Sequence, residues 1–581
     1  MNVIHIPYIK IIHFSLVTIL LLANSCKSKM DADIVLINGK VITVDSNFSI
    51  AEAVAISGDT VLAVGSNKEI RKITGKSTRI IDLNGKTVIP GLNDAHLHPD
   101  AAALSELDEE IPDVHKIEEL LAWIKDQTLK KEKGSWIIFS KFFSTRLEEM
   151  RLPTLTELDI AAPEHPVFLN GSFGGMINSC AMKVSGINKQ SKDPGIIKDE
   201  LTGLPTGFIR ASAFPVLKIP AKREISKEEW IKAFTKMMLK YNQYGITSIC
   251  AGTGDLKTMR MYRDMADSNI LTVRILQNIL LQTDELITRE SINNILKGYP
   301  EVTGAGDKWV KIGPLKVFLD GGILTGTAFM EEPWGEKAFQ IYSIKDPSYR
   351  GIVNFTRDEL LAIVSAANES GWSFTAHVTG DGAVNLLLDV YKEVNRKSSI
   401  NGKRFSIIHG NFFSNEAIAL MREMDIYANI QAAWFYKDAD AMNLILGKER
   451  IRIFHPNRTM LDAGIMLNGG SDHMVKLDAN SSVNPYNPFL AMWSMITRKT
   501  ERGSVIIPEE AITREEALKI YTINNAFASF EESVKGSIEP GKLADIAIIN
   551  KDILTCPVDS IKEIESLMTI VGGKIVYTNK K

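Results

Sequence analysis

The chain has 581 residues, of which 45 % are hydrophobic and 24 % are charged, and its formal net charge is −3. This balance is typical of a soluble globular protein with room for one large domain and an accessory domain, or for three small ones. Because there is no basic surplus to neutralise phosphates, we expect no nucleic-acid partner. The 4 cysteines, Cys26, Cys180, Cys250 and Cys556, are too few and too scattered for a disulfide scaffold.

The first residues have the pattern of a targeting signal. An apolar run over 11–23 follows Lys10, is too short to span a bilayer comfortably, and ends at Asn24-Ser25-Cys26. The pattern resembles a bacterial lipoprotein signal in which Cys26 becomes the lipidated first residue, although Ala23 stands where Leu is usual. We therefore predict a lipoprotein-type signal peptide over 1–26. The protein would then be extracytoplasmic and lipid-anchored to a bacterial membrane, at the periplasmic face or the cell surface. A plain secretory signal and an uncleaved anchor remain open.

Two β-rich segments bracket the rest of the chain. Both show alternating Val, Ile and Leu with Asn-Gly, Gly-Asp or Gly-Gly turns, as in DIVLINGKVITVD and TIVGGKIVYT, which indicates hairpins. Neither segment holds enough apolar residues for a core of its own. We therefore predict that residues 31–88 and 534–581 pair as one composite β-sandwich.

Between these segments, short buried strands alternate with amphipathic helical stretches, which favours βα units and a parallel sheet. The candidate strands are 87–96, 166–171, 245–251, 271–278, 314–320, 372–378, 404–409, 426–431 and 465–472. The strand over 166–171 falls in a long polar stretch, and treating residues 100–225 as an inserted subdomain leaves eight strands, the number that closes a barrel. The predicted fold is α/β: a (β/α)8 TIM-type barrel over 89–533, with a small β-sandwich formed by the N- and C-terminal segments and the insert after barrel strand one.

The tripeptide His96-Leu97-His98 carries the strongest functional signal. Residues i and i+2 of a strand point to the same face, so both imidazoles converge on one point. Imidazole is a common zinc ligand, and the pair follows an apolar run and the breaker Pro90-Gly91. The pattern indicates a metal site, against the alternative of two ordinary surface or packed histidines.

Other costly polar residues fall at the same end of the predicted strands, where barrel enzymes carry their chemistry. They are Lys316 and Asp320 in the 314–320 strand, His377 and His409 at the ends of the next two, and Asp472 at the end of the last. Taken singly, each histidine could be a satisfied strand-end residue and Asp472 a turn aspartate. Their shared position at one rim favours a common site.

With these motifs in place, the chain resembles the amidohydrolase superfamily and, within it, the large-insert amidohydrolase family 3 group of YtcJ-like hydrolases. The motifs are VIPGLNDAHLHPD, ELDIAAPEHPVFLNGS, LKVFLDGGILTGTA, AHVTGDGA, IIHG, LNGGSD, AITREEALKIYTINNA, GSIEPGKLADIAII and VGGKIVYT. They cover nearly the whole mature chain in the family's order. The resemblance implies a metal-bearing (β/α)8 barrel with a β-sandwich built from both chain ends.

The resemblance also implies roles for single residues. His96 and His98 would bind one metal, His377 and His409 would add the ligands of strands five and six, and Asp472 would touch a metal and handle protons. Lys316 matches a lysine that in many relatives is carboxylated and bridges two metals, and its apolar flank disfavours the ammonium. The alternatives are that Lys316 merely pairs with Asp320, that Lys311 takes its role, or that Cys250 is a thiolate ligand.

The predicted activity is hydrolysis of a non-peptide carbon–nitrogen bond by water activated on one or two divalent ions, with Zn²⁺ the first choice. Asp472 would act as general base and then general acid, and His377 or His409 would stabilise the oxyanion. We expect Phe173, Asp320 and Asp381 to contact the substrate. N-acyl amino acids, substituted formamides and cyclic amides are the candidate substrates.

Two departures from the family pattern leave the substrate open. Phe173 stands where many relatives have His, and Ser140-Lys141-Phe142-Phe143 replaces a Gly-Trp-Asp segment. The alternatives in function are a heterocycle deaminase on the same scaffold and a surface lipoprotein that binds a ligand without turnover. The expected partners are a small-molecule amide, a membrane reached through the lipidated N-terminus, and a second copy of the chain in a homodimer.

Overall fold

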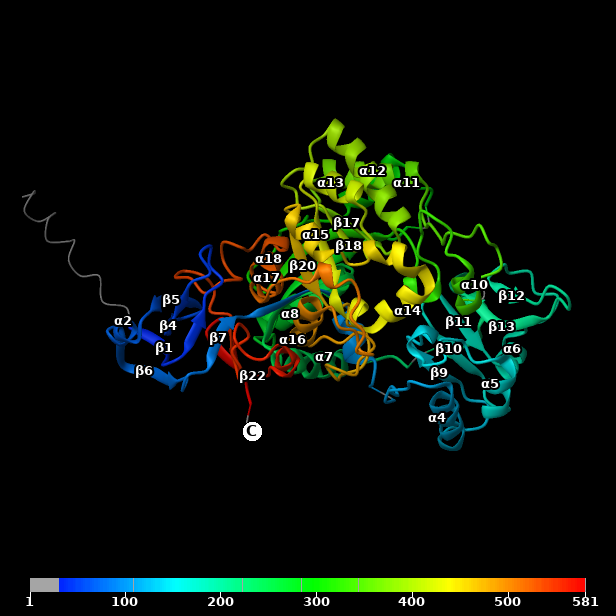
Figure 1. The fold of residues 1–581 in the computed structure, drawn as a ribbon, viewed down its shortest axis with the longest axis horizontal. Helices are drawn as coiled ribbons and strands as arrows, with labels where there is room; N and C mark the ends of the chain where they lie inside the picture. The colour runs from blue at the N-terminus through cyan, green and yellow to red at the C-terminus, as the bar shows by residue number, and fades with distance from the viewer. Residues whose placement is uncertain (1–30, 108, 222, 284, 343, 580–581) are drawn as a thin grey trace, which may run out of the picture.

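The computed structural model describes residues 31–579, apart from residues 108, 222, 284 and 343. The predicted signal over 1–26, including Cys26, lies outside the described residues. Among the helices that are described, none is both long and apolar enough to cross a membrane. Three parts follow one another along the longest axis of the molecule: a β-sandwich at one end, a barrel in the middle and the insert at the other end (Figure 1).

The central part is a sheet of eight parallel strands that closes into a barrel. In order around the sheet they are β8 (Leu92–Leu97), β14 (Ile246–Gly254), β15 (Arg274–Leu280), β16 (Val310–Phe318), β17 (Phe374–Val378), β18 (Ser406–His409), β19 (Tyr427–Gln431) and β20 (Leu467–Gly470). Just past the ends of β8 and β20, the Asp472 N–H donates to the His96 carbonyl at 2.7 Å, and the His98 N–H donates to the His473 carbonyl at 2.7 Å. These bonds join the first strand to the last, so the predicted α/β barrel is confirmed.

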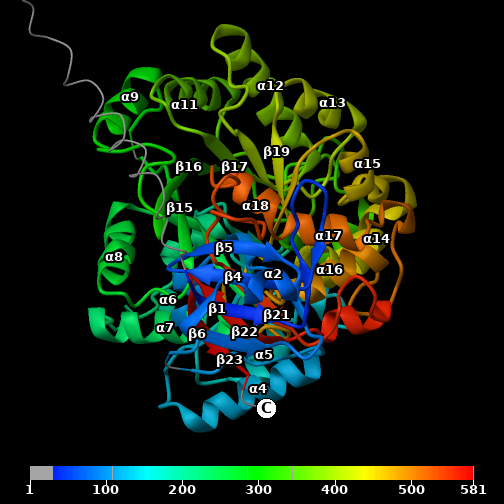
Figure 2. The ribbon, with the colours of Figure 1, turned by 90° about the vertical axis from the view of Figure 1, so that its left-hand side faces the viewer.

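Helices surround the barrel because the sequence between strands has an apolar face and a defined start (Figure 2). Ser226 and Thr356 are examples of such helix starts. The hydroxyl of each accepts from the backbone N–H of the Glu three residues on, and the carboxylate of that Glu accepts from the backbone N–H of the Ser or Thr. Both bonds satisfy N–H groups that have no partner within the helix. The helices that follow the strands are α3 (Pro99–Leu104), α7 (Lys227–Asn242), α8 (Leu256–Asp267), α9 (Arg289–Lys297), α10 (Glu336–Tyr342), α11 (Arg357–Glu369), α12 (Asp381–Lys397), α13 (Asn415–Glu423), α14 (Ala432–Arg450), α15 (Asn457–Asp462), α16 (Pro488–Thr497), α17 (Arg514–Ile520) and α18 (Ile523–Ala528).

The run predicted as one strand over 87–96 is two strands in different sheets. Thr87–Pro90 forms β7 of the sandwich, and the barrel strand β8 starts only at Leu92. Gly91 lies between them with its N–H bonded to the Asp545 carbonyl at 2.8 Å, and a Cβ there would lie 2.2 Å from Thr247 Oγ1. The chain therefore changes sheets at Pro90-Gly91, where the Thr247 side chain leaves no room for a Cβ.

The sandwich consists of a four-stranded and a six-stranded sheet. The first contains β5 (Thr60–Gly65), β4 (Ala53–Ser57), β1 (Ala32–Ile37) and β6 (Thr74–Asp82), with α2 (Asn67–Arg71) beside them. The second contains β23 (Lys574–Thr578), β22 (Ser566–Val571), β21 (Ile546–Ile549), β7, β2 (Lys40–Ile42) and β3 (Ile50–Ala51). Antiparallel pairing of β7 with β21 joins the two chain ends, and Val54, Val88 and Ile546 share one buried core. The composite sandwich predicted from both chain ends is thus present.

The insert after β8 has its own five-stranded sheet. Its strands are β12 (Ile196–Lys198), β13 (Pro205–Arg210), β11 (Gly174–Ile177), β10 (Val167–Asn170) and β9 (Ile137–Ser140), with helices α4 (Ile117–Lys130), α5 (Leu155–Ala161) and α6 (Ser179–Ser185). Leu120 and Leu158 pack with Leu169 on one face of the sheet, whereas Ala181 packs with Phe168 on the other. The strand predicted over 166–171 is therefore β10 of this sheet and not a barrel strand.

Candidate metal centre

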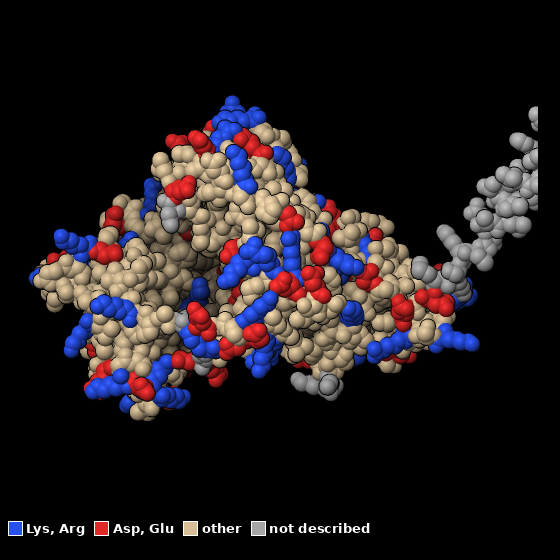
Figure 3. All heavy atoms as spheres, turned by 180° about the vertical axis from the view of Figure 1, so that it is seen from behind, with Lys and Arg blue, Asp and Glu red and all other residues tan. Residues whose placement is uncertain are grey.

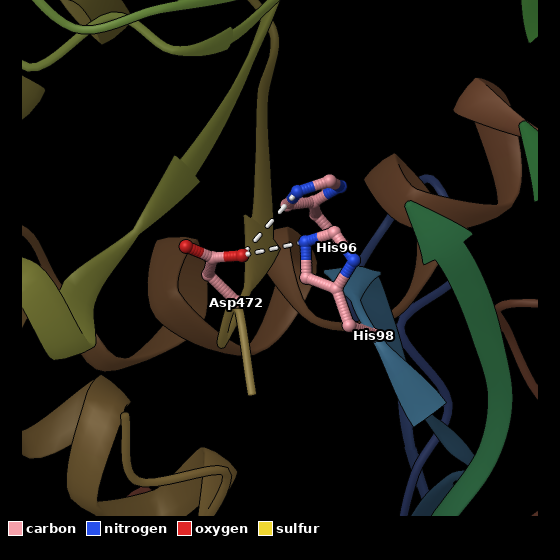
Figure 4. A group of neighbouring side chains, drawn as sticks. All are labelled: His96, His98 and Asp472. Carbon is pink, nitrogen blue, oxygen red and sulfur yellow. Dashed lines mark ion pairs between the residues drawn. The ribbon is translucent and has the colours of Figure 1, made fainter. Parts of the chain in front are cut away.

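Three side chains from the first and last barrel strands meet at the carboxyl end of the barrel (Figure 4). Asp472 Oδ1 lies 3.2 Å from Nε2 of His98 and 3.5 Å from Nε2 of His96. One donor atom from each of the three residues lies within 4.8 Å of the other two. Asp472 has φ 55°, so a non-glycine residue in a left-handed conformation turns this carboxylate toward β8.

Strand β14 fixes both imidazoles of β8. Thr253 Oγ1 lies 3.1 Å from Nδ1 of His98, which leaves Nε2 of that ring to face Asp472. Nδ1 of His96 has no hydrogen-bond partner among the described residues, and the ring instead lies against the backbone of Gly252, where a Cβ would come within 2.2 Å of His96 Cε1. Hydrogen bonding orients one imidazole, and close packing orients the other.

The next ring of polar residues comes from β16, β17 and β18. Lys316 Nζ is fully buried, lies 3.5 Å from Nε2 of His96, and sits 4.9 Å from the centre of the Phe318 ring. His409 Nδ1 lies 2.7 Å from Gln431 Oε1, so its Nε2 is left to face the site. His377 Nε2 lies 3.0 Å from the Gly321 carbonyl oxygen, to which it donates, so Nδ1 is its acceptor nitrogen. The rings of His377 and His409 are 4.5 Å apart.

These contacts decide among the alternatives for Lys316. Asp320, its suggested partner, accepts backbone N–H groups of Phe329, Thr379 and Gly380 at 2.9–3.0 Å instead. Lys311 forms an ion pair with Glu531 at 3.2 Å near the start of β16. Lys316 is therefore the lysine whose amine reaches the histidines.

Cys250 is not part of the donor group. It donates to Asn278 Oδ1 at 3.4 Å, and burial raises the pKa of its thiol to about 12, so the group stays a protonated thiol. The placement gives no support to the thiolate-ligand alternative.

Burial sets the charge states of the centre. It lowers the pKa of His409 to about 4 and also lowers the pKa values of His96, His98 and His377, so these imidazoles are neutral near pH 7. Burial raises the pKa of Asp472, but the close contact with His98 and the nearby His409 and Lys316 favour the ionised carboxylate and bring the pKa to about 2. The centre thus combines neutral nitrogen donors with one carboxylate.

This donor set fits a divalent metal ion. Metal ligands must be deprotonated, and the imidazoles and the carboxylate are. Asp472 Oδ1 is buried without a hydrogen-bond donor among the described residues, although it faces two imidazole nitrogens. A cation would satisfy this oxygen and both nitrogens at once.

A cavity of about 420 Å³ opens onto the centre. His98, His377, His409 and Asp472 form its floor, and its walls are largely apolar, with Phe143, Phe173, Phe318, Ile323, Leu324, Trp434 and Met474. Phe173 comes from the turn after β10 and lies 5.9 Å from the ring of His377. The space-filling view shows a hollow between the insert and the barrel (Figure 3).

Not every residue expected to contact substrate lies at this cavity. Phe173 does, but Asp320 and Asp381 are not among its lining residues. Asp320 ties the end of β16 to the start of α12, and Asp381 accepts the Glu331 N–H at 2.8 Å. Both carboxylates thus hold loops in place behind the cavity. They point away from it because they accept hydrogen bonds from the surrounding backbone N–H groups.

Several lining residues were not singled out as site residues from the sequence. Lys141, Phe143 and Ser172 come from insert turns, Asn411 from a barrel loop and Trp434 from the first turn of α14, and their residue types have no spacing that indicates a pocket. The one available signal was the change from the usual Gly-Trp-Asp segment to Ser140-Lys141-Phe142-Phe143. Gln431, at the end of β19, could have been found as a polar residue closing an apolar strand.

With the geometry established, comparison with known proteins identifies the family. The profile of the Amidohydrolase family matches residues 79–577. The chain belongs to this family. The chain is therefore an amidohydrolase, which is a hydrolase acting on carbon–nitrogen bonds.

Two curated amidohydrolase relatives match nearly end to end. An N-substituted formamide deformylase of Arthrobacter pascens is 28 % identical over 94 % of this chain and 98 % of its own length. The putative amidohydrolase YtcJ of Bacillus subtilis is 25 % identical over 90 % of this chain and 96 % of its own. Among solved structures, an uncharacterised metal-dependent hydrolase from Pyrococcus horikoshii superposes with a TM-score of 0.66 at 22 % identity, covering 90 % of this chain and 99 % of its own. That likeness is one of fold.

Proposed function

We propose that this amidohydrolase cleaves the carbon–nitrogen bond of a small amide with water activated by a divalent metal ion, and that the ion is Zn²⁺. The observation that carries the proposal is the meeting of His96, His98 and Asp472 at the floor of an apolar cavity. Two imidazoles and a carboxylate are ligands that suit zinc.

His96, His98 and Asp472 would hold the first ion. His377 and His409, with Lys316 next to His96, are placed to take part in holding a second. When bound, such an ion polarises a carbonyl group and lowers the pKa of water from about 15.7 to about 7.

The residues of the chain supply proton transfer and orientation. Asp472, ionised at neutral pH, accepts the proton of the attacking water and delivers it to the departing nitrogen. His377 and His409 line the cavity, but their N–H groups are donated to Gly321 and Gln431, so each offers a lone pair that suits a metal ion and not an oxyanion. The apolar walls exclude bulk water, which strengthens these interactions. The products are a carboxylic acid, formic acid in the case of a formamide, and an amine.

The formamide deformylase relative supports substituted formamides as substrates, and N-acyl amino acids and cyclic amides share the same scissile bond. The test is turnover of a panel of these compounds by metal-loaded protein, with amine and ammonia measured separately and zinc measured by elemental analysis. We expect amine release, bound zinc, and loss of activity when a chelator removes the metal.

Asp472→Asn is the decisive variant, because the amide keeps the shape of the side chain and loses its basicity. We expect kcat to fall by about 10²- to 10⁴-fold. The matched control is Asp113→Asn, since the Asp113 side chain is half-exposed and its ion pair in the described part of the chain is with the exposed His115. Wild-type activity in Asp472→Asn or in metal-free protein would refute the proposal. Release of ammonia alone would favour the deaminase, and bound metal without turnover would favour a binding protein.

We also propose the lipid anchor as a separate property of the chain. The lipobox-like sequence before Cys26 supports it. Wild-type protein expressed in a bacterium should incorporate labelled palmitate and sediment with membranes, and Cys26→Ser should do neither. Labelling of the Cys26→Ser variant would show that the anchor lies elsewhere.

A further inference from the structure

Lys141 brings a cationic side chain to the wall of the cavity. Among the described residues that line the cavity, only Lys141 and Asp472 carry a formal charge at neutral pH. Asp472 belongs to the metal centre and faces two imidazoles. Lys141 comes from the insert, outside the barrel that carries the metal donors, so its charge is not part of the metal centre.

The insert sheet is built so that Lys141 reaches the cavity. Strands β9 and β10 run parallel, with Ser140 opposite Asn170, and each ends in a turn with a left-handed non-glycine residue. These residues are Lys141, with φ 59°, and Ser172, with φ 74°. Such conformations are unfavourable for side chains of this kind and gather at functional sites.

The two turns place the side chains of Lys141 and Ser172 together. Lys141 Nζ donates to Ser172 Oγ at 2.8 Å, and both residues line the cavity. The Ser172 N–H is held by Asn170 Oδ1 at 2.8 Å, and the Phe142 N–H by the Asn170 carbonyl at 2.8 Å. The ammonium is therefore fixed at the cavity wall by a preformed loop pair.

The charge of Lys141 lacks a carboxylate partner within the described part of the chain. Its ammonium makes a single hydrogen bond, to Ser172, and only the more distant Asp472 favours its charge. Two neighbouring cations are compensated, because Arg146 pairs with Asp438 at 2.9 Å and Lys437 pairs with Glu501. A half-buried ammonium without a counter-charge is unfavourable, so its two remaining N–H donors are best satisfied by an anion that enters the cavity.

We propose that Lys141, with Ser172, binds a carboxylate of the substrate, and that the substrate is an N-acyl derivative of an apolar amino acid and not a neutral amide. This inference rests on the proposed function and narrows it to one substrate class. The aromatic walls formed by Phe143, Phe173 and Trp434 suit the apolar side chain of such a compound.

The first test compares two substrates that differ only in the carboxylate, N-formylphenylalanine and N-formylphenethylamine. We expect metal-loaded wild-type protein to prefer the acid in kcat/KM. In Lys141→Met, the ratio of the two kcat/KM values should fall by roughly 10- to 100-fold, mainly through a higher KM for the acid. Lys141→Arg keeps the charge and should retain a larger share of the preference. An unchanged ratio in Lys141→Met would overturn the inference.

The second test measures binding without turnover. Calorimetry with metal-loaded protein compares hydrocinnamate with hydrocinnamyl alcohol, which lacks the charge. Wild type should bind the acid at least about tenfold more tightly, and Lys141→Met should lose that advantage. A carboxylate that binds only the metal would keep its affinity in Lys141→Met, which would refute the role of Lys141.

Controls separate this inference from folding and from the proposed function. Lys133→Met removes an exposed lysine of the same insert and should leave both ratios unchanged. If Lys141→Met does not fold, as judged by thermal unfolding, Lys141→Gln replaces it. If neither formyl compound is hydrolysed but hydrocinnamate binding depends on Lys141, the anion site is supported and the amidase proposal is refuted. Equal binding of acid and alcohol would sink the anion site alone.

Discussion

Gly252→Ala should displace His96, a proposed metal ligand, by steric overlap alone. A Cβ at this position of β14 would lie 2.2 Å from Cε1, 2.7 Å from Nδ1 and 3.0 Å from Nε2 of His96. Ordinary contact begins near 3.4 Å, so the imidazole must move by about 1.2 Å. Ligand distances tolerate only about 0.2 Å, and we expect metal affinity to fall at least about 10- to 100-fold.

The assay is zinc retention during dialysis against a competing chelator, with thermal unfolding measured in parallel. Overpacking alone costs about 1–3 kcal/mol, so the variant should remain folded. A double-mutant cycle with His96→Ala isolates the mechanism: adding Gly252→Ala to His96→Ala should weaken zinc binding no further. Wild-type zinc affinity in Gly252→Ala, or additive losses in the double variant, would refute the idea that this ring is held by packing.

Three further predictions concern other buried charges. Burial lowers the pKa of Lys316 to about 8, which favours the free amine that carbamate formation requires. The intact mass of the protein should exceed the sequence mass by about 44 Da, and acid should remove this excess. Full activity of Lys316→Ala would exclude a bridging role. Arg274 of the barrel forms a buried ion pair with Asp545 of the sandwich at 2.7 Å. Asp545→Asn should therefore lower the free energy of unfolding, measured by urea titration, by about 3–5 kcal/mol. A loss below about 1 kcal/mol would show that the pair does not stabilise the contact between barrel and sandwich. Burial and Arg498 lower the pKa of His455 to about 3. Between pH 3 and about 6.5 the unfolded chain therefore binds one more proton than the folded chain, and the free energy of unfolding falls as the pH falls. His455→Gln should reduce the slope of the free energy of unfolding against pH by about 1.4 kcal/mol per pH unit, and an unchanged slope would contradict the assignment.

Much of the barrel could be predicted because its signals are local. Whether a residue closes an apolar strand depends on a few neighbours, so the sequence alone placed His96, His98, His377, His409 and Asp472 at strand ends and Lys316 within a strand. The count of eight strands then implied one rim for them all. Their order along the chain and the parallel topology determined that they would meet.

The same local reasoning failed where two distant segments compete for one stretch of chain. The run over 87–96 has a continuous strand pattern, yet its first half pairs with β21, more than four hundred residues away, and its second half pairs with β14. Asp320 has the residue type of a site ligand, but its carboxylate accepts hydrogen bonds from three backbone N–H groups, at residue 329 and at residues 379–380. No periodicity records such partners.

The sequence by itself determined the family, the barrel with its sandwich, and the donors at the rim, because residue type and period are properties of short segments. The tertiary structure decided which donors converge, which nitrogen each imidazole presents, and what surrounds the substrate. Lys141 and Ser172 lie 31 positions apart, and their contact exists only because β9 and β10 pair in one register. Pairing of that kind depends on the free energy of the whole fold, which short segments do not contain.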